Sequence, residues 1–300
     1  MRIGLVTFLL LCATLAAIIV AGCTQSPQTT TQATEQPTAT ATVTAMSTTA
    51  ADTVKIGTTS LGNVLTDSKG LTLYYFITDV PGTGTSTCYS AANCSQYWPI
   101  FSPASVIVSP PLSASDFTTF TRTDGTMQAA YDGHPLYYFV KDANPGDVNG
   151  ENVLHTWFVA KPDYAVMIAS TPALGEFLTD ADGRTLYVFV KDVLGGSTCT
   201  GACLTKWPAF STSSFVVPSI LKTSDFSMLT RSDGVRQVAY LGRPLYYYSG
   251  DTGPGMTTGS GFAGNWYVAN ITGFLPAATP TPTTVPTTTA PTMNPYSSGY

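Results

Sequence analysis

The sequence predicts an all-β fold built from a duplicated antiparallel meander. Three observations support this prediction: the folded region repeats itself, an aromatic-rich strand motif recurs four times, and Asp-Gly turns separate short apolar runs. The apolar periodicity that indicates helices is nearly absent.

The duplication is seen by matching positions along the chain. Residues 94–157 match residues 203–266 at a constant offset of 109, without an insertion. Upstream of them the offset is 113, so the length change lies in the loop before the second cysteine of each half. We therefore predict two copies of one domain, a first repeat half at 52–162 and a second at 163–275.

Inside each half, a strand motif of the form Tyr-x-aromatic-x-x-Asp occurs twice, which gives four repeat units of about 50–60 residues. Both faces of this strand are apolar, which is typical of a strand buried between layers. Four units suit either a propeller-like closure or paired β-sandwich or barrel halves. The motif residues are Tyr74, Phe76 and Asp79, Tyr137, Phe139 and Asp142, Tyr187, Phe189 and Asp192, and Tyr246, Tyr248 and Asp251.

The second unit shows the expected strands most clearly, at residues 117–122, 126–131, 136–141 and 157–160. Asp-Gly pairs at 124–125 and 132–133 predict hairpin turns, since glycine adopts the positive φ that such turns require. The four motif aspartates are each followed by turn residues. We expect their carboxylates to accept backbone N–H groups two or three residues further on, rather than to bind a metal or catalyse a reaction.

Four cysteines belong to the folded region, two in each half. In an oxidising compartment they favour two local disulfides, each stabilising by about 2 kcal/mol. A redox-active pair or a metal–thiolate site is the alternative, but the sequence lacks Cys-x-x-Cys and the intervals differ between the halves. The expected pairs are Cys88 with Cys94 and Cys199 with Cys203.

One loop offers the oxygen ligands that Ca²⁺ prefers. Its spacing departs from the EF-hand pattern, and the counterpart at 251–260 keeps only the first carboxylate, so turn chemistry explains the same residues. Calcium is the one cofactor that the sequence raises. The candidate ligands are Asp142, Asn144, Asp147, Asn149 and Glu151.

A hydrolytic site would need a nucleophile, a base and an orienting acid. The only histidines are His134 and His155, and their counterparts in the duplicate are Arg243 and Gly264. We expect His134 to be an exposed turn residue. The sequence therefore predicts no catalytic residues and a protein that is not an enzyme.

The N-terminus has the parts of an export signal at residues 1–22: a basic start, an apolar run and small residues. The small residues before Cys23 resemble a lipoprotein cleavage site, which predicts a lipid anchor on that thiol and a place outside the cytoplasm, on the membrane at the cell surface. Residues 23–51 are expected to form a Thr-rich disordered stalk and residues 276–300 a Thr/Pro-rich disordered tail.

The charge balance bears on the expected partners. Removing residues 1–22 leaves 12 basic and 18 acidic residues, without a basic cluster to hold phosphates. This excludes nucleic acid as an expected partner. The sequence does not indicate an oligomeric state.

The recurring Tyr-x-aromatic-x-x-Asp units, with their Asp-Gly, Pro-Leu-Tyr and Trp-x-Val elements, resemble the secreted lipoprotein repeat family across residues 54–269. This resemblance implies a location and a repeat architecture, not a reaction. The resulting hypothesis is a surface lipoprotein with a binding or structural role, whose partner is an envelope polymer, a protein or a small ligand. The alternatives are a redox or electron-transfer protein and a calcium-stabilised envelope component.

Overall fold

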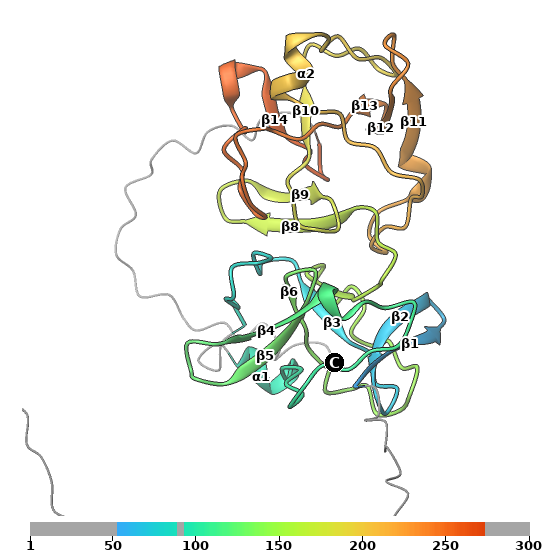
Figure 1. Cartoon of the computed structure of the whole chain (residues 1–300), viewed down its shortest axis with the longest axis vertical. Coiled ribbons are helices and arrows are strands. Elements are labelled where there is room, and N and C mark those ends of the chain that lie inside the picture. Colours follow the sequence, from blue (N-terminus) through green and yellow to red (C-terminus); the bar gives the residue numbers. More distant parts are fainter. Residues whose placement is uncertain (1–52, 89–92, 274–300) are drawn as a thin grey trace, which may run out of the picture. The chain divides into compact units, whose positions relative to one another are not determined.

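The computed structural model describes residues 53–88 and 93–273 (Figure 1). The predicted signal peptide, Cys23, the stalk to residue 51 and the tail at 276–300 lie outside the described residues. Among the described residues, no helix has the length and apolar character needed to cross a bilayer.

We call residues 53–162 the first half and residues 163–273 the second half. The elements of the first half are β1 (Val54–Thr59), β2 (Gly62–Asp67), β3 (Tyr74–Phe76), α1 (Cys94–Tyr97), η2 (Ala114–Asp116), β4 (Phe117–Thr121), β5 (Met127–Tyr131), β6 (His134–Pro135) and β7 (Trp157–Val159). Those of the second half are β8 (Met167–Thr171), β9 (Gly175–Thr179), β10 (Tyr187–Phe189), α2 (Ala202–Lys206), η3 (Thr223–Asp225), β11 (Phe226–Thr230), β12 (Arg236–Tyr240), β13 (Arg243–Pro244), η4 (Phe262–Gly264) and β14 (Trp266–Val268).

The two halves have the same sheet topology. The first half contains the pairs β1-β2 and β3-β7 and the three-stranded sheet β4-β5-β6, and the second half contains β8-β9, β10-β14 and β11-β12-β13. All of these pairs are antiparallel (Figure 1). The predicted all-β class with four repeats is confirmed. Within the described residues, however, no sheet closes into a barrel or has the four strands of a propeller blade.

The predicted hairpin turns are present. Asp132 and Gly133 both have positive φ, 45° and 79°, which is the backbone of a type I′ turn and joins β5 to β6. Leu241 and Gly242 repeat this turn between β12 and β13, with φ of 47° and 77°. The predicted strands at 117–122, 126–131 and 157–160 correspond to β4, β5 and β7.

The predicted strand at 136–141 was wrong as a regular element. Tyr137 forms isolated bridges to Tyr74 on one side and Ile100 on the other. The next amides donate elsewhere, with Tyr138 N bonding Pro99 O at 2.7 Å and Val140 N bonding Tyr97 O at 3.0 Å. This segment changes partners along its length, so no ladder forms, and the same holds for Tyr246 in the second half.

The cores repeat as well. Each half has an aromatic cluster that includes two tryptophans and its first cysteine, for example Trp98, Trp157 and Cys88 in the first half. A larger cluster joins the halves, because Tyr75 and Phe158 pack with apolar residues of the second half such as Val188. The motif strands β3 and β10 therefore position one aromatic cluster in each half.

Candidate functional site

An aromatic column fills the centre of the first half. The rings of Trp98 and Trp157 stack with centroids 3.8 Å apart and planes within 4°. Phe76 stacks on the outer face of Trp157 at 4.2 Å, and Phe139 stacks on the outer face of Trp98 at 4.5 Å. Each motif strand therefore contributes one end of the column.

The second half builds the same column from its own residues. Trp207 and Trp266 stack at 3.8 Å, and Phe189 lies 4.3 Å from Trp266. Tyr248 packs on Trp207 at 4.4 Å, in the position that Phe139 occupies in the first half. The replacement of phenylalanine by tyrosine in the fourth motif leaves this packing in place.

The motif tyrosines and aspartates are exchanged between the two units of each half. In the first half, the Tyr137 hydroxyl donates to Asp79 at 2.5 Å and the Tyr74 hydroxyl donates to Asp142 at 2.6 Å. Their backbones are also paired, because Tyr74 N donates to Tyr137 O and Tyr137 N to Tyr74 O. Each half is therefore a reciprocal pair of units.

The second half repeats this exchange. The Tyr246 hydroxyl donates to Asp192 at 2.6 Å, and the Tyr187 hydroxyl donates to Asp251 at 2.5 Å. All four motif aspartates thus bind a tyrosine of the other unit. The four carboxylates do not meet in a common site, since each is hydrogen-bonded to a different tyrosine.

The backbone partners of these aspartates differ from the expectation. Their Oδ1 atoms accept the amides of residues six to eight positions further on, not two or three. The tyrosine hydroxyl fixes the other oxygen, so the following loop has to fold back over a longer distance to reach the carboxylate. The amide donors are Thr87 at 2.6 Å, Asn149 at 2.9 Å, Thr198 at 2.6 Å and Thr258 at 3.0 Å.

Burial governs the protonation of this cluster. It raises the pKa of Asp79, although Thr87 and Tyr137 donate to the carboxylate and oppose the shift. It likewise raises the pKa of Asp142 and lifts that of the Tyr137 hydroxyl well above its ordinary value. A tyrosine with a raised pKa keeps its proton at neutral pH and donates it to the carboxylate.

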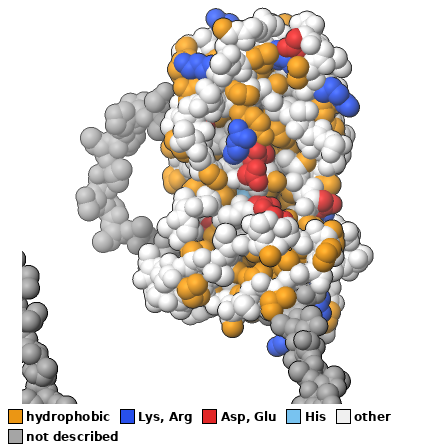
Figure 2. All heavy atoms as spheres, viewed as in Figure 1, with side chains coloured by type: hydrophobic (Ala, Val, Ile, Leu, Met, Phe, Trp, Pro, Cys, Tyr) orange, Lys and Arg blue, Asp and Glu red, His pale blue; other side chains and the backbone are white. Residues whose placement is uncertain are grey.

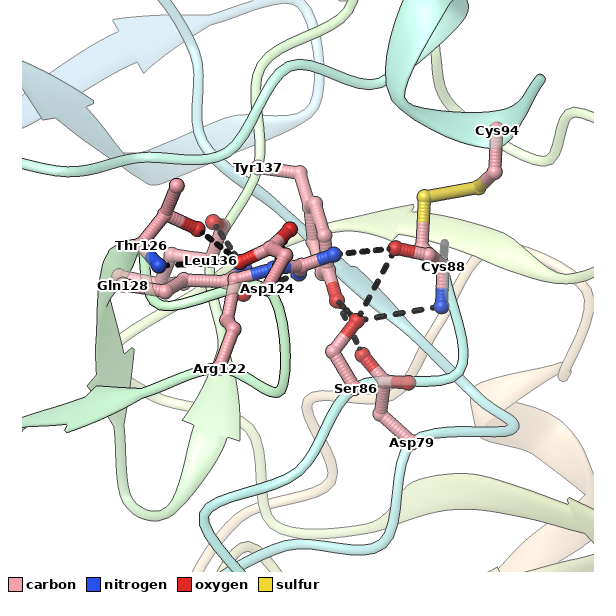
Figure 3. Close-up of polar contacts among 10 residues, drawn as sticks. All are labelled: Asp79, Ser86, Cys88, Cys94, Arg122, Asp124, Thr126, Gln128, Leu136 and Tyr137. Atoms are coloured by element: carbon pink, nitrogen blue, oxygen red, sulfur yellow. Dashed lines mark hydrogen bonds and ion pairs between the residues drawn. A yellow bond between two sulfur atoms is a disulfide. The ribbon is translucent and has the colours of Figure 1, made fainter. Parts of the chain in front are cut away.

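A buried arginine links this network to the disulfide (Figure 3). Arg122 donates to Gln128 Oε1 at 2.7 Å and to the carbonyl of Cys88 at 2.6 Å, and Gln128 donates to Leu136 O at 2.9 Å. The Tyr137 hydroxyl also bonds Ser86 Oγ at 2.6 Å. The guanidinium therefore fixes the loop that carries the first cysteine.

The second half has the same arginine network. Arg231 donates to Gln237 Oε1 at 2.6 Å and to the carbonyl of Cys199. Sequence reasoning missed these residues. The signal was present, because Arg122 and Gln128 recur at the 109-residue offset as Arg231 and Gln237.

The structure joins the cysteines as expected. Cys88 bonds Cys94 and Cys199 bonds Cys203, and each bridge closes a short loop beside the aromatic column. Cys88 and Cys199 are both buried. Despite the different intervals, the arginine of each half donates to the carbonyl of the first cysteine, and Arg231 donates in addition to Ser197 Oγ at 2.6 Å.

The candidate calcium ligands are engaged separately. Asp142 binds Tyr74 and Asn149, while Asp147 accepts the amides of Ala143 and Asn144. The Glu151 carboxylate accepts the amide of Val159 at 2.7 Å. Within residues 53–88 and 93–273, no three His, Cys, Asp or Glu side chains are grouped so that they could hold a metal ion.

The expectation of an exposed His134 was wrong. Its ring is buried where the halves meet, packs edge-on against Tyr75 at 5.5 Å, and its Nε2–H donates to Ala181 O at 3.2 Å. Burial lowers the pKa of His134 to about 4. Sequence position suggested a free turn because the covering residues come from the other half. His155, by contrast, is exposed.

Comparison with known protein families also finds a fourfold repeat in this chain. A family model described as a secreted repeat of unknown function matches the chain four times, at residues 55–102, 118–161, 169–211 and 227–270. No curated protein and no solved structure matches the chain. The four matches coincide with the four motif units and together cover more than half of the sequence. The chain therefore belongs to the Lipoprotein_15 family of secreted repeats.

Proposed function

We propose that this protein is a lipid-anchored surface scaffold with a binding or structural role, and that it is not an enzyme. One observation supports the proposal: the tyrosines and aspartates that recur in all four repeats are hydrogen-bonded to one another. Membership of a secreted repeat family makes the chain an extracytoplasmic repeat protein. The anchor, the role and the partner are the proposed part.

The recurring polar groups are occupied by structural contacts. Asp79 is buried and accepts from Thr87 and Tyr137, and Asp192 is buried and accepts from Thr198 and Tyr246. A general base needs an oxygen within reach of a substrate. The residues shared by the four units are therefore better explained by the requirements of folding than by a reaction common to all units.

The role can be tested with Asp79→Asn, which keeps the shape of the side chain and removes its charge. We expect the variant to lose stability and to keep its attachment to isolated cell-envelope fragments, measured by co-sedimentation of the full chain with the fragments. The proposal would be contradicted if the wild type turned over a substrate and Asp79→Asn abolished this activity while its circular dichroism spectrum stayed the same as that of the wild type.

The lipid anchor is proposed on Cys23, because small residues precede this cysteine directly after an apolar run. Labelling cells with a radioactive fatty acid should mark the wild type and leave Cys23→Ser unlabelled. Cys12→Ser is the matched control and should remain labelled. Label that persists in Cys23→Ser would contradict the anchor.

The proposed partner is an envelope polymer or a surface protein, not a nucleic acid. Figure 2 shows Lys and Arg side chains scattered singly on the face in view, without a basic patch. Charged residues make up only 10% of the chain. Binding through hydroxyl, aromatic and apolar groups fits this surface better than binding through charge.

A second candidate, electron transfer, is favoured by the stacked tryptophans and by the tyrosines hydrogen-bonded to carboxylates. It would use redox-active disulfides or these rings. Thiol titration and a reduction potential separate the two roles: structural bridges have potentials below about −300 mV. A less negative potential, near that of known exchange enzymes, would favour the redox role.

A further inference from the structure

The two halves meet through a loop and a glycine surface. The first-half loop, residues 80–82, directly follows Asp79, and Pro81 is buried. A Cβ placed on Gly183 would lie 2.5 Å from Pro81 Cγ, and one placed on Gly255 would collide with Val80. The loop therefore lies directly against what we call the second-half platform, formed by Gly183, Pro254 and Gly255.

Hydrogen bonds and apolar packing strengthen this contact. The amide of Ser170 donates to Ile77 O at 2.8 Å, and His134 donates to Ala181 O at 3.2 Å. Ile77, just before the loop, is only 2% exposed and belongs to the cluster shared by the halves. The loop and the platform thus form part of a well-packed interface.

The duplication provides a second copy of the loop. The second-half loop, residues 193–195, lies at the 113-residue offset from the first. Its Gly195 amide donates to Gly242 O at 2.7 Å, just as Gly82 donates to Gly133 O at 3.0 Å. The two loops therefore make the same anchoring contact to their own halves.

The second-half loop is uncovered in the part of the chain that the structure describes. Val193 is 63% exposed and Leu194 is 72% exposed, whereas Pro81, which corresponds to Leu194, is buried. Val190, the counterpart of Ile77, is 41% exposed. Leu241 is 46% exposed and precedes Gly242, on which a Cβ would lie 3.4 Å from Leu194 Cδ2, so Val193, Leu194 and Leu241 form an exposed apolar patch. Such patches on soluble proteins mark interaction sites.

The first half has a second copy of the platform. We call Gly70, Pro145 and Gly146 the first-half platform. Gly146 N donates to Gly70 O at 3.3 Å, as Gly255 N donates to Gly183 O at 2.9 Å. A Cβ on Gly146 would meet nothing within 4 Å, in contrast to the matching Gly255. Among the described residues, this platform has no loop lying on Gly146.

We propose that a second copy of this chain places its second-half loop on the first-half platform, so that the contact between halves is repeated between molecules. The loop and the platform are different surfaces, so the contact is heterologous. A dimer of this kind keeps one loop free on one molecule and one platform free on the other, so it can bind further copies. Association continues head to tail into chains or closes into a ring.

The first test measures assembly of the full chain, extracted in a mild detergent, by sedimentation velocity at increasing concentration. The wild type should form dimers and larger species, and the double variant Val193→Asp with Leu194→Asp should weaken association about tenfold or more. Val235→Asp is the matched control, because Val235 is 48% exposed and lies in the turn between β11 and β12, outside the apolar patch. A wild type that stays monomeric, or a double variant that assembles normally, would overturn the proposal.

The second test fixes the geometry. Cells that express a Val193→Cys chain together with a differently tagged Pro145→Cys chain are treated with a short bis-maleimide. Cross-links should join the two tags. If Val193→Cys chains cross-link to each other instead, the contact is loop to loop and the proposed arrangement is wrong. Absence of any cross-link while the wild type assembles would also overturn it.

Discussion

The first and second halves have similar interiors and differ in the exposure of the loop that follows the first motif aspartate of each half. Both have the tryptophan pair stacked at 3.8 Å, the exchanged tyrosine–aspartate bonds, the buried arginine and a disulfide. The loop at 80–82 is covered, whereas the loop at 193–195 is exposed. The repeated residues therefore specify how two units pair, whereas these two loops differ where a half meets a neighbour.

Position 134 illustrates the difference. The first half has a buried His134 there, donating to the second half, whereas the second half has Arg243, which is partly exposed. A neutral ring suits a contact that excludes water, and a guanidinium suits a surface that water reaches. This duplicated position thus differs in keeping with its surroundings, while the stacked tryptophans, the tyrosine–aspartate bonds and the buried arginine are the same in both halves.

Loss of a stacked tryptophan should have the largest effect and tests whether the interiors are equivalent. We expect Trp157→Ala and Trp266→Ala each to lower the free energy of unfolding by about 3–5 kcal/mol, because each leaves a cavity between aromatic neighbours. Chemical denaturation of the full chain gives both values. A difference between them of more than about 2 kcal/mol would mean that one half depends less on its column.

The buried histidine should make stability fall in acid. Its pKa is about 4 in the folded state, against 6.5 for an ordinary histidine, so between these values only the unfolded chain takes the proton. Stability from this group is therefore fully present above pH 6.5 and is lost as the pH falls through 4, by about 3 kcal/mol. Asp132 acts in the opposite sense, because burial raises its pKa to about 6.

His134→Gln isolates this contribution, because Asp132 is present in both proteins. The difference in unfolding free energy between wild type and variant should change by about 3 kcal/mol between pH 7 and pH 4. His155→Gln is the control, since His155 is exposed and should leave the pH profile unchanged. Parallel profiles for wild type and His134→Gln would show that the ring is not held neutral.

Removal of one exchanged hydroxyl should have a smaller effect. Tyr137→Phe leaves Asp79 buried without one donor, and we expect a loss of about 1–3 kcal/mol. Tyr246→Phe, its counterpart opposite Asp192, should cost a similar amount. Thermal or denaturant unfolding gives both values, with Tyr267→Phe as a control because its hydroxyl makes only an exposed bond.

A rescue separates the hydroxyl bond from simple loss of packing. Adding Asp79→Asn to Tyr137→Phe removes the buried charge and should recover part of the lost stability, since a neutral amide is less costly to leave underbonded. If the double variant loses as much unfolding free energy as the two single variants lose in sum, the hydroxyl and the carboxylate are not coupled.

Much of the fold was predictable because its signals are local. Asp-Gly pairs fix hairpin turns, cysteines a few residues apart form local bridges, and an offset of 109 residues reveals the duplication. The exchange of Tyr137 with Asp79 was not predictable in this way. It joins residues 58 apart, and it depends on how two similar units pair in space.

Two wrong predictions, an exposed His134 and a regular strand at 136–141, also arise from long-range contacts. His134 lies in a hairpin turn, and such turns are usually exposed, but the second half covers it. Residues 136–141 have the composition of a strand, but their amides bond to three different segments. In both cases long-range contacts decided the outcome, and these contacts leave no local pattern.

Calcium should have the smallest effect of all. The loop at 142–151 has the carboxylates that a calcium site needs, and the loop at 251–260 keeps only Asp251. Both loops nevertheless close in the same way, since Asn149 donates to Asp142 and Thr258 donates to Asp251 through both backbone and side chain. Closure therefore does not require the additional carboxylates.

Because the two loops close in the same way, we expect no change in melting temperature when Ca²⁺ or EDTA is added to the full chain at about 10 mM, a concentration that fills weak extracellular sites. A site with a dissociation constant of about 0.1–1 mM would stabilise the fold by about 1–3 kcal/mol at that concentration. Such a shift, absent in Asp147→Ala, would show that the first-half loop gained a function that its duplicate lacks. An unchanged melting temperature means that the carboxylates of this loop serve only its hydrogen bonds.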